Sequence, residues 1–302
     1  MRVVVLMSTY NGERFVEAQI HSILDQLPAA GILLIRDDGS RDETVSRIEA
    51  FADARIHITC GENIGFSGSF LALMAFAPKD ADMYMLADQD DVWMQNKIER
   101  AWNYIQRYLD KPILYCSKLR VVDEKLQSPR DSPIWPHPPS FRNALAENIV
   151  TGCTVAMNLP MLEIATKCSR RELIFFHDWW LYLVASAFGE VFYDEMPTIL
   201  YRQHGTNVIG MGTGIHRYLA ILRFLRRTNW TRIMINQVTI LQETFGPFLS
   251  SQQSNLITRY FVPDTIKSRL RLIFSPARFR QRISGEIFFR MLMAVEFILK
   301  RT

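Results

Sequence analysis

Residues 83–93 have the sequence MYMLADQDDVW, in which an apolar run ends abruptly in three carboxylates within four residues. The apolar part is typical of a buried β-strand. Its carboxyl end is where open α/β sheets place their ligand crevice. Adjacent carboxylates repel one another unless a proton or a cation intervenes, and Mg²⁺ or Mn²⁺ suits oxygen ligands and can bridge to phosphate. The alternative is a solvated acidic turn that caps the next helix.

The sequence on either side of this stretch alternates between strand and helix patterns. Strand-like runs are expected at 2–8, 32–35, 56–59 and 83–87, with helical spacing over 13–26 and 96–109. Such alternation predicts a mostly parallel sheet with right-handed crossovers. The second half is less regular, with strands expected at 113–117, 150–157, 191–193 and 198–201, a proline-rich loop at 128–139, a helix from 177, and helices from 215 onward.

Three polar loops follow strands of the first half: Ser8–Asn11, Asp37–Ser40 and Asp88–Asp91. Because the carboxyl ends of parallel strands lie on one edge of a sheet, we expect these loops to converge. Taken alone, the second loop is equally consistent with a turn and helix cap. The first strand is not followed by GxGxxG, which disfavours a dinucleotide-binding Rossmann domain, and the absence of GxxxxGK[ST] excludes a P-loop.

Composition and charge suggest a globular protein with two regions. The chain has 302 residues, 48% of them hydrophobic and 22% charged. Its four cysteines lack CxxC spacing, which argues against a zinc site or a disulfide scaffold and suits a reducing cytoplasm. We expect no signal peptide, and no apolar run reaches the ~18 residues of a spanning helix.

The charge is distributed unevenly along the chain. Residues 211–302 hold 15 Lys+Arg and 4 Asp+Glu, a balance of +11, whereas residues 1–210 have a balance of −7. We therefore expect a catalytic domain over 1–210 and a basic helical region over 211–302. The basic region could face anionic lipid, nucleic acid or water.

An ordered set of short motifs runs through the first two thirds of the chain. The motifs are Ser8–Gly12, Asp37–Ser40, Asn63–Gly65, Asp88–Asp91, Thr151–Cys153 and His177–Asp178. Over residues 2–210 the chain resembles the family 2 inverting glycosyltransferases. The resemblance implies a single A-type α/β fold with a basic C-terminal helical extension. Residues 63–68 with 88–93, and 201–204 with Asn207, are most similar to bacterial rhamnosyltransferases of O-antigen or capsule assembly.

The resemblance implies roles on the donor side of the site. Asp38 matches the aspartate that recognises the nucleotide base, and its carboxylate can accept a hydrogen bond from the imide N–H of uracil or thymine. Asp88 and Asp90 match the metal-binding DxD pair, with Asp90 the direct ligand. His204 matches a histidine that meets the metal or diphosphate, although a lone histidine is more often a packing or capping residue. The remaining donor-binding candidates are Ser8, Thr9, Tyr10, Asn63 and Gly65.

On the acceptor side, Asp178 matches the family's catalytic base, which takes a proton from the attacking hydroxyl. The family commonly has Glu-Asp here, and this chain has His177 before Asp178. The alternative is that Asp178 only caps the helix that follows. Gly152 is placed on the same side. Trp179 and Trp180 either form an apolar wall for a sugar face or pack in the core.

Together these features predict a metal-dependent inverting glycosyltransferase. Its donor would be dTDP-rhamnose and its acceptor a lipid-linked glycan, at the cytoplasmic face of the cell membrane. A UDP-hexose donor is the first alternative. A non-catalytic nucleotide- or nucleic-acid-binding protein is the second, and we expect no nucleic acid because the basic third lacks a nucleic-acid motif.

Apolar and basic residues alternate over 216–227 and 278–301, a pattern that fits helices lying on an anionic membrane surface. The alternative is that these helices pack on the catalytic body with their arginines in solvent.

Overall fold

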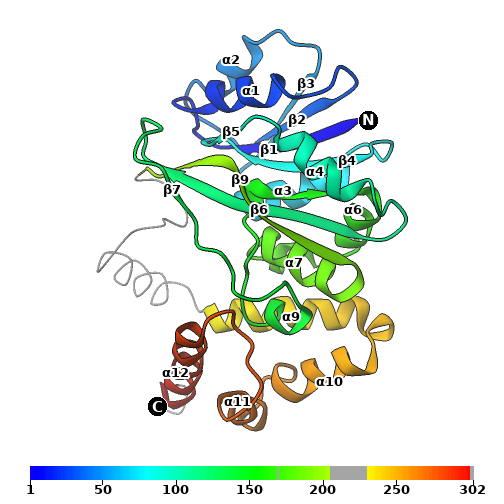
Figure 1. Ribbon diagram of the computed structural model, residues 1–302, viewed down its shortest axis with the longest axis vertical. Helices are drawn as coiled ribbons and strands as arrows, with labels where there is room; N and C mark the ends of the chain where they lie inside the picture. The colour runs from blue at the N-terminus through cyan, green and yellow to red at the C-terminus, as the bar shows by residue number, and fades with distance from the viewer. Residues whose placement is uncertain (169, 205–229, 300–302) are drawn as a thin grey trace.

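The computed structural model describes residues 1–168, 170–204 and 230–299, with side chains up to 295. Asn207 and the basic segment 216–227 therefore lie outside the described residues. Within them, one sheet of nine strands has the order β3-β2-β1-β4-β8-β6-β9-β5, and β7 pairs with β6. In Figure 1 the N-terminal strands and helices lie at one end of the molecule and α10, α11 and α12 at the other.

The strands are β1 (Val3–Thr9), β2 (Ile32–Asp37), β3 (Ile56–Cys60), β4 (Met83–Asp88), β5 (Val92–Trp93), β6 (Ile113–Val122), β7 (Arg130–Asp131), β8 (Ala156–Met157) and β9 (Glu190–Arg202). The α-helices are α1 (Val16–Leu24), α2 (Thr44–Glu49), α3 (Gly65–Phe76), α4 (Lys97–Ile105), α5 (Phe141–Ala144), α6 (Leu159–Ala165), α7 (His177–Phe188), α9 (Trp230–Phe245), α10 (Ser251–Tyr260), α11 (Ile266–Ile273) and α12 (Ile283–Leu299). Short 3₁₀ turns are η1 (Gly152–Thr154), η2 (Arg171–Leu173) and η3 (Gly246–Phe248).

The first half of the sheet is parallel, as predicted. β1 lies between β2 and β4 and pairs in parallel with both, and β2 pairs in parallel with β3. The register places Thr9 opposite Asp37 and Ser8 opposite Asp88. β1 and β4 are covered by helices on both faces, which is why they are continuous apolar runs. The three polar loops therefore meet at one edge of the sheet.

The second half of the sheet, where the sequence pattern is less regular, is mixed. β8 pairs antiparallel with both β4 and β6, and it covers only two residues of the strand expected at 150–157 because Gly152–Thr154 form a 3₁₀ turn. The strands expected at 191–193 and 198–201 are one strand, β9, which pairs in parallel with β6. An irregular register beside Pro197 lets β9 continue through a residue that cannot donate a backbone hydrogen bond.

Two hydrophobic clusters cover the two faces of the sheet. One contains α1, α2 and α4 side chains, and the other contains side chains of α3, α6, α7 and α9. In α9, Met234, Val238 and Leu241 are buried in the same cluster as the α7 side chains. The described part of the C-terminal region is thus joined to the face of the molecule that carries α7.

Candidate active site

The loops after β1 and β4 are tied together by hydrogen bonds. Tyr10 N donates to Gln89 Oε1 at 2.8 Å, and Gln89 Nε2 donates back to Tyr10 O at 2.9 Å. A Cβ on Gly12 would lie 2.2 Å from Gln89 Oε1, so this close approach requires glycine. The loop after β2 joins them, because Asp38 N donates to Thr9 O at 2.8 Å. The convergence predicted from the strand pattern is present.

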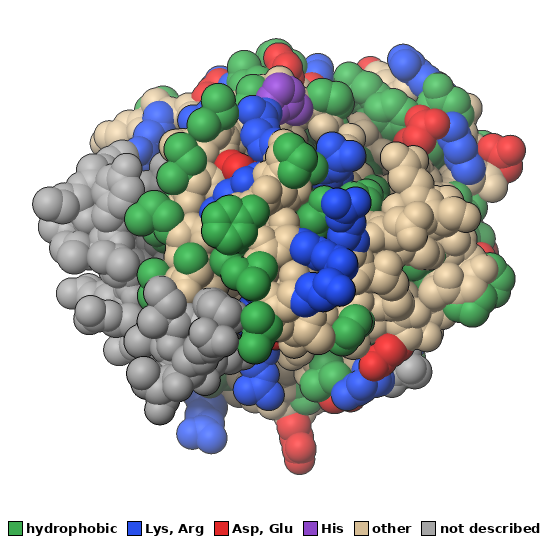
Figure 2. Space-filling model, turned by 90° about the horizontal axis from the view of Figure 1, so that it is seen from below, with side chains coloured by type: hydrophobic (Ala, Val, Ile, Leu, Met, Phe, Trp, Pro, Cys, Tyr) green, Lys and Arg blue, Asp and Glu red, His purple; other side chains and the backbone are tan. Residues whose placement is uncertain are grey.

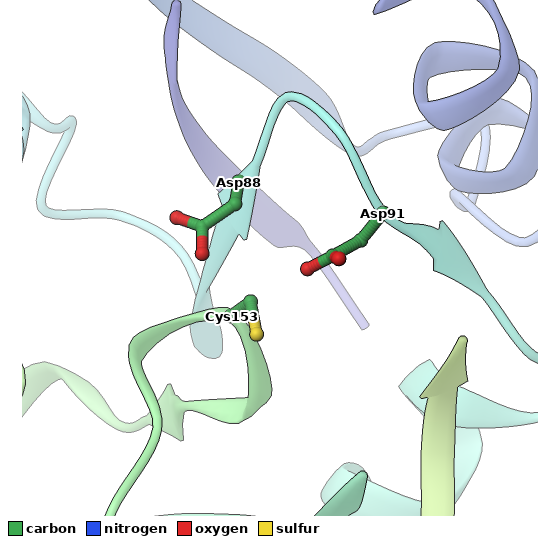
Figure 3. A group of neighbouring side chains, drawn as sticks. All are labelled: Asp88, Asp91 and Cys153. Atoms are coloured by element: carbon green, nitrogen blue, oxygen red, sulfur yellow. The ribbon is translucent and has the colours of Figure 1, made fainter. Parts of the chain in front are cut away.

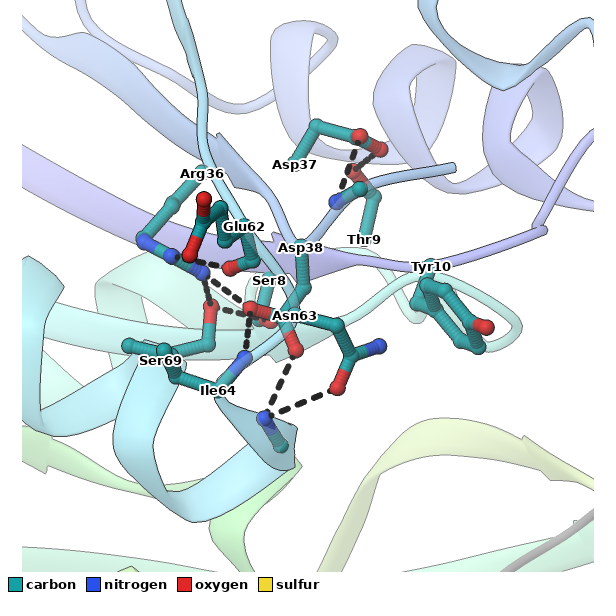
Figure 4. Close-up of polar contacts among 12 residues, drawn as sticks. Ser8, Thr9, Tyr10, Arg36, Asp37, Asp38, Glu62, Asn63, Ile64 and Ser69 are labelled. Carbon is teal, nitrogen blue, oxygen red and sulfur yellow. Dashed lines mark hydrogen bonds and ion pairs between the residues drawn. The ribbon is translucent and has the colours of Figure 1, made fainter. Parts of the chain in front are cut away.

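The Asp38 carboxylate fixes the start of α3 (Figure 4). It is 2% exposed, accepts from Ile64 N and Gly65 N at 2.9 Å each, and pairs with the Arg36 guanidinium. Gly65 has a φ of +78°, a left-handed conformation that favours glycine. Asp38 therefore already supports the loop on which Asn63 and Gly65 lie.

The other donor-side candidates surround Asp38 (Figure 4). Thr9 Oγ1 donates to Asp37 Oδ2 at 2.9 Å, and Ser8 Oγ donates to Ser69 Oγ at 2.7 Å. Both of these side chains hold neighbouring loops in place. Tyr10 is 46% exposed and Asn63 is also exposed, so these two offer free surface to a ligand.

Carboxylates from the loop after β4 gather with groups from distant segments. Asp90 Oδ2 lies 2.7 Å from His204 Nε2, which brings together the two residues predicted to meet the metal. Asp88, Asp91 and Cys153 each offer a ligand atom within 4.8 Å of the others (Figure 3). Burial and the neighbouring carboxylates raise the pKa of Asp88 and of Asp91.

This cluster fits a divalent cation. Asp91 is fully buried, and its Oδ2 has no hydrogen-bond partner among the described residues. Burial first, and then the charge of Asp90, raises the pKa of both neighbours, so ionisation of all three carboxylates together is unfavourable without a proton or a cation. Carboxylate and imidazole ligands are compatible with Mg²⁺ or, more comfortably, Mn²⁺.

Two cations that support the carboxylates were missed at the level of sequence. The Lys97 side chain is fully buried, and its Nζ donates to Cys153 O at 3.1 Å and Thr198 Oγ1 at 3.2 Å. Burial lowers the pKa of Lys97 to about 8, against the opposing charges of Asp91 and Asp88. The sequence does indicate that Lys97 is buried, because it lies on the same face of α4 as the buried residues Ala101 and Ile105.

Arg202, at the end of β9, is the second of these cations. Its backbone N donates to Asp91 Oδ1 at 3.1 Å, and its Nε donates to Asp90 O at 2.8 Å. The guanidinium also lies 4.7 Å from the centre of the Phe15 ring. Arg202 therefore fixes the backbone of the acidic loop, two residues before His204 in the chain.

Asp178 lies in the first turn of α7, at the crevice. Burial raises the pKa of Asp178 to about 6, and its charge in turn helps raise the pKa of Asp88. The predicted base is thus within electrostatic reach of the predicted metal carboxylates, although ninety residues separate Asp178 from Asp88 in the chain. Asp178 Oδ1 also accepts from Trp179 N at 2.7 Å, but Asp178 lies within the first turn and the N-cap residue of α7 is Phe176.

Gly152 and His177 pack directly beside the base. A Cβ on Gly152 would lie 2.7 Å from His177 Nε2 and 3.7 Å from Asp178 Cβ. The His177 ring stacks on Phe70 with centroids 4.3 Å apart, and burial lowers the pKa of His177 to about 3. A neutral imidazole therefore takes the place of the acidic neighbour that the resemblance led us to expect.

Trp179 and Trp180 do not form a wall for a sugar, which corrects that expectation. They are 2% and 0% exposed and belong to the core beneath α7. Their indole N–H groups donate to Ala144 O at 2.7 Å and Ala165 O at 3.0 Å. Both side chains therefore stabilise the helix that carries Asp178.

A cavity of about 480 Å³ lies away from this site, between α5, the start of α10 and residues 278–281. It contains no residue predicted for the active site.

A mixed α/β sheet with a carboxylate cluster at the end of its fourth strand defines an A-type glycosyltransferase fold. The sequence profile described as "Glycosyl transferase family 2" matches residues 4–167, and the chain belongs to this family. The solved structure of S. aureus TarS 1-349 in complex with UDP shares the fold, with a TM-score of 0.54 at 14% identity over 85% of this chain and 86% of that one.

Two relatives indicate the range of donors among similar proteins. The chain is 29% identical to the dTDP-rhamnosyl transferase RfbG of Shigella flexneri over 77% of this chain and 83% of the relative. It is 34% identical to the UDP-Glc:alpha-D-GlcNAc-diphosphoundecaprenol beta-1,3-glucosyltransferase WfgD of Escherichia coli, over 32% of this chain and 38% of that protein. The chain is therefore a glycosyltransferase with a rhamnosyltransferase among its relatives.

Proposed function

We propose that this glycosyltransferase is metal-dependent and inverting, and that it transfers L-rhamnose from dTDP-rhamnose onto a lipid-linked glycan at the cytoplasmic face of the cell membrane. The observation that carries the proposal is that Asp178, in the first turn of α7, lies close enough to Asp88 for its charge to raise the pKa of Asp88, while burial raises the pKa of Asp178 itself to about 6. Similarity to RfbG over most of both chains supports the donor.

Asp178 is the proposed general base. Inversion requires the acceptor hydroxyl to attack the sugar from the face opposite the leaving diphosphate. Asp178 comes from α7, whereas the donor-side carboxylates come from the end of β4 and the loop that follows it, so two separate elements supply the proposed base and the proposed metal ligands. A pKa of about 6 leaves the carboxylate largely ionised at neutral pH and still basic enough to accept a proton.

Asp90 and His204, which lie 2.7 Å apart, and Asp88, whose carboxylate lies within 4.8 Å of the Asp91 carboxylate, would hold Mg²⁺ or Mn²⁺. When bound, the cation supplies positive charge that balances the charge developing on the diphosphate. Lys97 and Arg202 keep the acidic loop in position. Tyr10 and Asn63 are the proposed exposed contacts for the nucleoside, above the loop that Asp38 fixes.

A UDP-hexose donor is the second candidate. It is favoured by the similarity to WfgD, whose name includes UDP-Glc, and by the fold shared with TarS, which was solved in complex with UDP-GlcNAc. Asp38 does not separate the two donors, because uracil and thymine present the same imide N–H.

A panel of nucleotide sugars distinguishes these donors. We expect dTDP-rhamnose with Mn²⁺ to raise the melting temperature of the protein more than UDP-glucose or UDP-GlcNAc, because a ligand that binds only the folded state stabilises it. Thermal denaturation with and without Mn²⁺ measures this. A larger shift with a UDP-hexose would replace the proposed donor, and no shift with any nucleotide sugar would contradict the proposed function.

The Asp38→Ala substitution should weaken binding of dTDP or UDP by roughly 1–3 kcal/mol, the value of a charged hydrogen bond. Because Asp38 also holds α3 and pairs with Arg36, this variant should melt at a lower temperature. Calorimetry below that temperature separates the two effects. Asp53→Ala is the matched control, since Asp53 pairs with Arg55 away from the crevice. Unchanged nucleotide affinity of the Asp38 variant would leave Asp38 with a structural role alone.

A further inference from the structure

The last two helices expose regularly spaced apolar side chains. We call this surface the α11–α12 face. Its apolar members are Ile266, Leu270, Phe274, Ile283, Ile287, Phe288, Met291 and Val295. Residues four apart lie on one side of a helix, so 266, 270 and 274 form one stripe and 283, 287, 291 and 295 form another. The two helices are in contact with each other.

The exposure is large for apolar residues. Phe274 is 78% exposed, Ile283 66% and Met291 62%. On the opposite sides of the same helices, Leu272, Phe289 and Met293 are fully buried in the core. Both helices are therefore apolar on two sides. Packing on the body of the protein accounts for the buried side of each helix and leaves the exposed apolar side unexplained. A contiguous exposed apolar surface of this kind is typical of a membrane or protein contact.

The charges around the stripes are positive. Lys267, Arg271 and Arg282 are exposed on these helices and on the segment between them. Among the acids of this segment whose side chains are described, Asp264 pairs with Arg269 and Glu286 is buried against Arg290. Figure 2 shows this end of the molecule, where apolar and basic side chains intermingle and acidic ones lie mostly toward the edge.

We propose that the α11–α12 face docks on the surface of an anionic bilayer, with its apolar stripes in the headgroup region and its basic side chains on the lipid phosphates. None of the described helices is long and apolar enough to cross a membrane. A second copy of the chain is a poorer occupant. A symmetric pairing of this face would bring Lys267 and Arg271 of both copies together and leave their charge uncompensated.

The docking face is connected to the catalytic base through packed helices. α12 and α11 pack on the core that contains α9, and α9 packs on α7, which begins with His177 and Asp178. Docking would therefore bring the side of the molecule that carries α7 toward the bilayer. The docking itself does not depend on the proposed function. Only its purpose, the capture of a lipid-linked acceptor, rests on that proposal.

Co-sedimentation of the full chain with vesicles tests the apolar part. The vesicles are phosphatidylethanolamine with phosphatidylglycerol, compared with phosphatidylcholine alone, and no donor is present. The double substitution Phe274→Ser, Met291→Ser should lower the partition coefficient on anionic vesicles by roughly tenfold or more, because less apolar surface enters the headgroup region. Phe76→Ser is the matched control, because Phe76 is 83% exposed at the end of α3, and this variant should bind as the native chain does.

A second variant and control test the contribution of the basic side chains to membrane binding. Lys267→Gln with Arg271→Gln should lower binding to anionic vesicles by roughly 25-fold, about fivefold for each charge removed. Lys167→Gln, an exposed lysine on the catalytic body, should change it little. Native binding should also fall with added salt, which screens surface attraction.

Equal binding of both double variants and the native chain would overturn the proposal. So would a native dimer that becomes monomeric with Phe274→Ser, Met291→Ser, since the face would then belong to a second copy. Donor turnover by each variant on a soluble acceptor analogue separates this proposal from the proposed function. Turnover without vesicle binding removes the docking face alone, whereas binding without turnover removes the proposed enzyme activity alone.

Discussion

The substitution Asp178→Asn should lower sugar transfer by roughly two to four orders of magnitude, the usual contribution of a general base, while donor and metal binding persist. Asparagine keeps the shape of the side chain and can still accept a hydrogen bond from Trp179 N, but it cannot take the acceptor proton. Transfer is measured with purified variant and donor, and nucleotide and Mn²⁺ affinities by calorimetry. Loss of donor binding together with transfer would indicate a structural role instead.

The melting temperature of the Asp178→Asn variant distinguishes a catalytic role of Asp178 from a structural one. The folded-state pKa of Asp178 is about 6, above its ordinary value near 3.8, because burial disfavours the charged form. The ionised carboxylate therefore costs the native state free energy at neutral pH, and this cost shrinks as the pH falls from about 6 and is gone below the ordinary pKa near 3.8. A neutral asparagine avoids it, so the variant should melt no lower than the native protein at pH 7.

The pH dependence gives a third readout. Native transfer should fall about tenfold per pH unit below about pH 6, where protonation removes the base, and Asp178→Asn should lack this limb. Glu195→Gln is the matched control, since Glu195 is an exposed carboxylate on β9. Its neighbour Asp194 is not a substitute base, because it is 4% exposed and held by Arg100 and by the Tyr115 hydroxyl. Near-normal transfer by Asp178→Asn would leave the chain without an assigned base.

The parallel half of the fold was predictable because its signals are local. The strand from Met83 to Asp88 and the run around Val3 to Met7 are apolar throughout, and each ends in polar turn residues. Such runs identify buried strands and their order of alternation with helices. The mixed half depends on pairings between distant segments, such as β8 with both β4 and β6. A strand of two residues, such as β8, is too short to show an alternating or apolar pattern in the sequence.

In the site, too, the features that depend on local sequence were predictable and those that depend on contacts between distant segments were not. The loops around Asp38 and Asp88 were expected to meet because both follow parallel strands. The pairing of Asp90 with His204 joins residues 114 apart, and only the family resemblance suggested it. Lys97 was missed because a charged residue at the start of a helix is usually solvated, whereas here the side chain is buried beside Asp91 and Asp88, whose charges offset part of the cost of its burial. Trp180 was ambiguous because an aromatic residue suits both a sugar face and a core.

The substitution Asp90→Asn should reduce turnover by roughly two to three orders of magnitude and should also weaken Mn²⁺ binding, because it removes one charge from the proposed metal ligands. The amide oxygen can still accept from His204 Nε2, now 2.7 Å from the carboxylate, so the loop should stay in place and the melting temperature should change little. Calorimetry or the electron-spin resonance of Mn²⁺ measures binding independently of activity.

Asp110→Asn is the matched control for the Asp90 variant, because Asp110 is an exposed acid in the loop after α4 and its neutralisation changes the net charge of the chain equally. It should leave both Mn²⁺ affinity and turnover as they are. Native turnover should stop in excess chelator and return when Mn²⁺ or Mg²⁺ is added, since the diphosphate then regains its counter-charge. Full activity of Asp90→Asn in chelator would remove the metal from the reaction. Protonation of the buried cluster, which the raised pKa of Asp88 and of Asp91 favours, would then be the remaining way to relieve its repulsion.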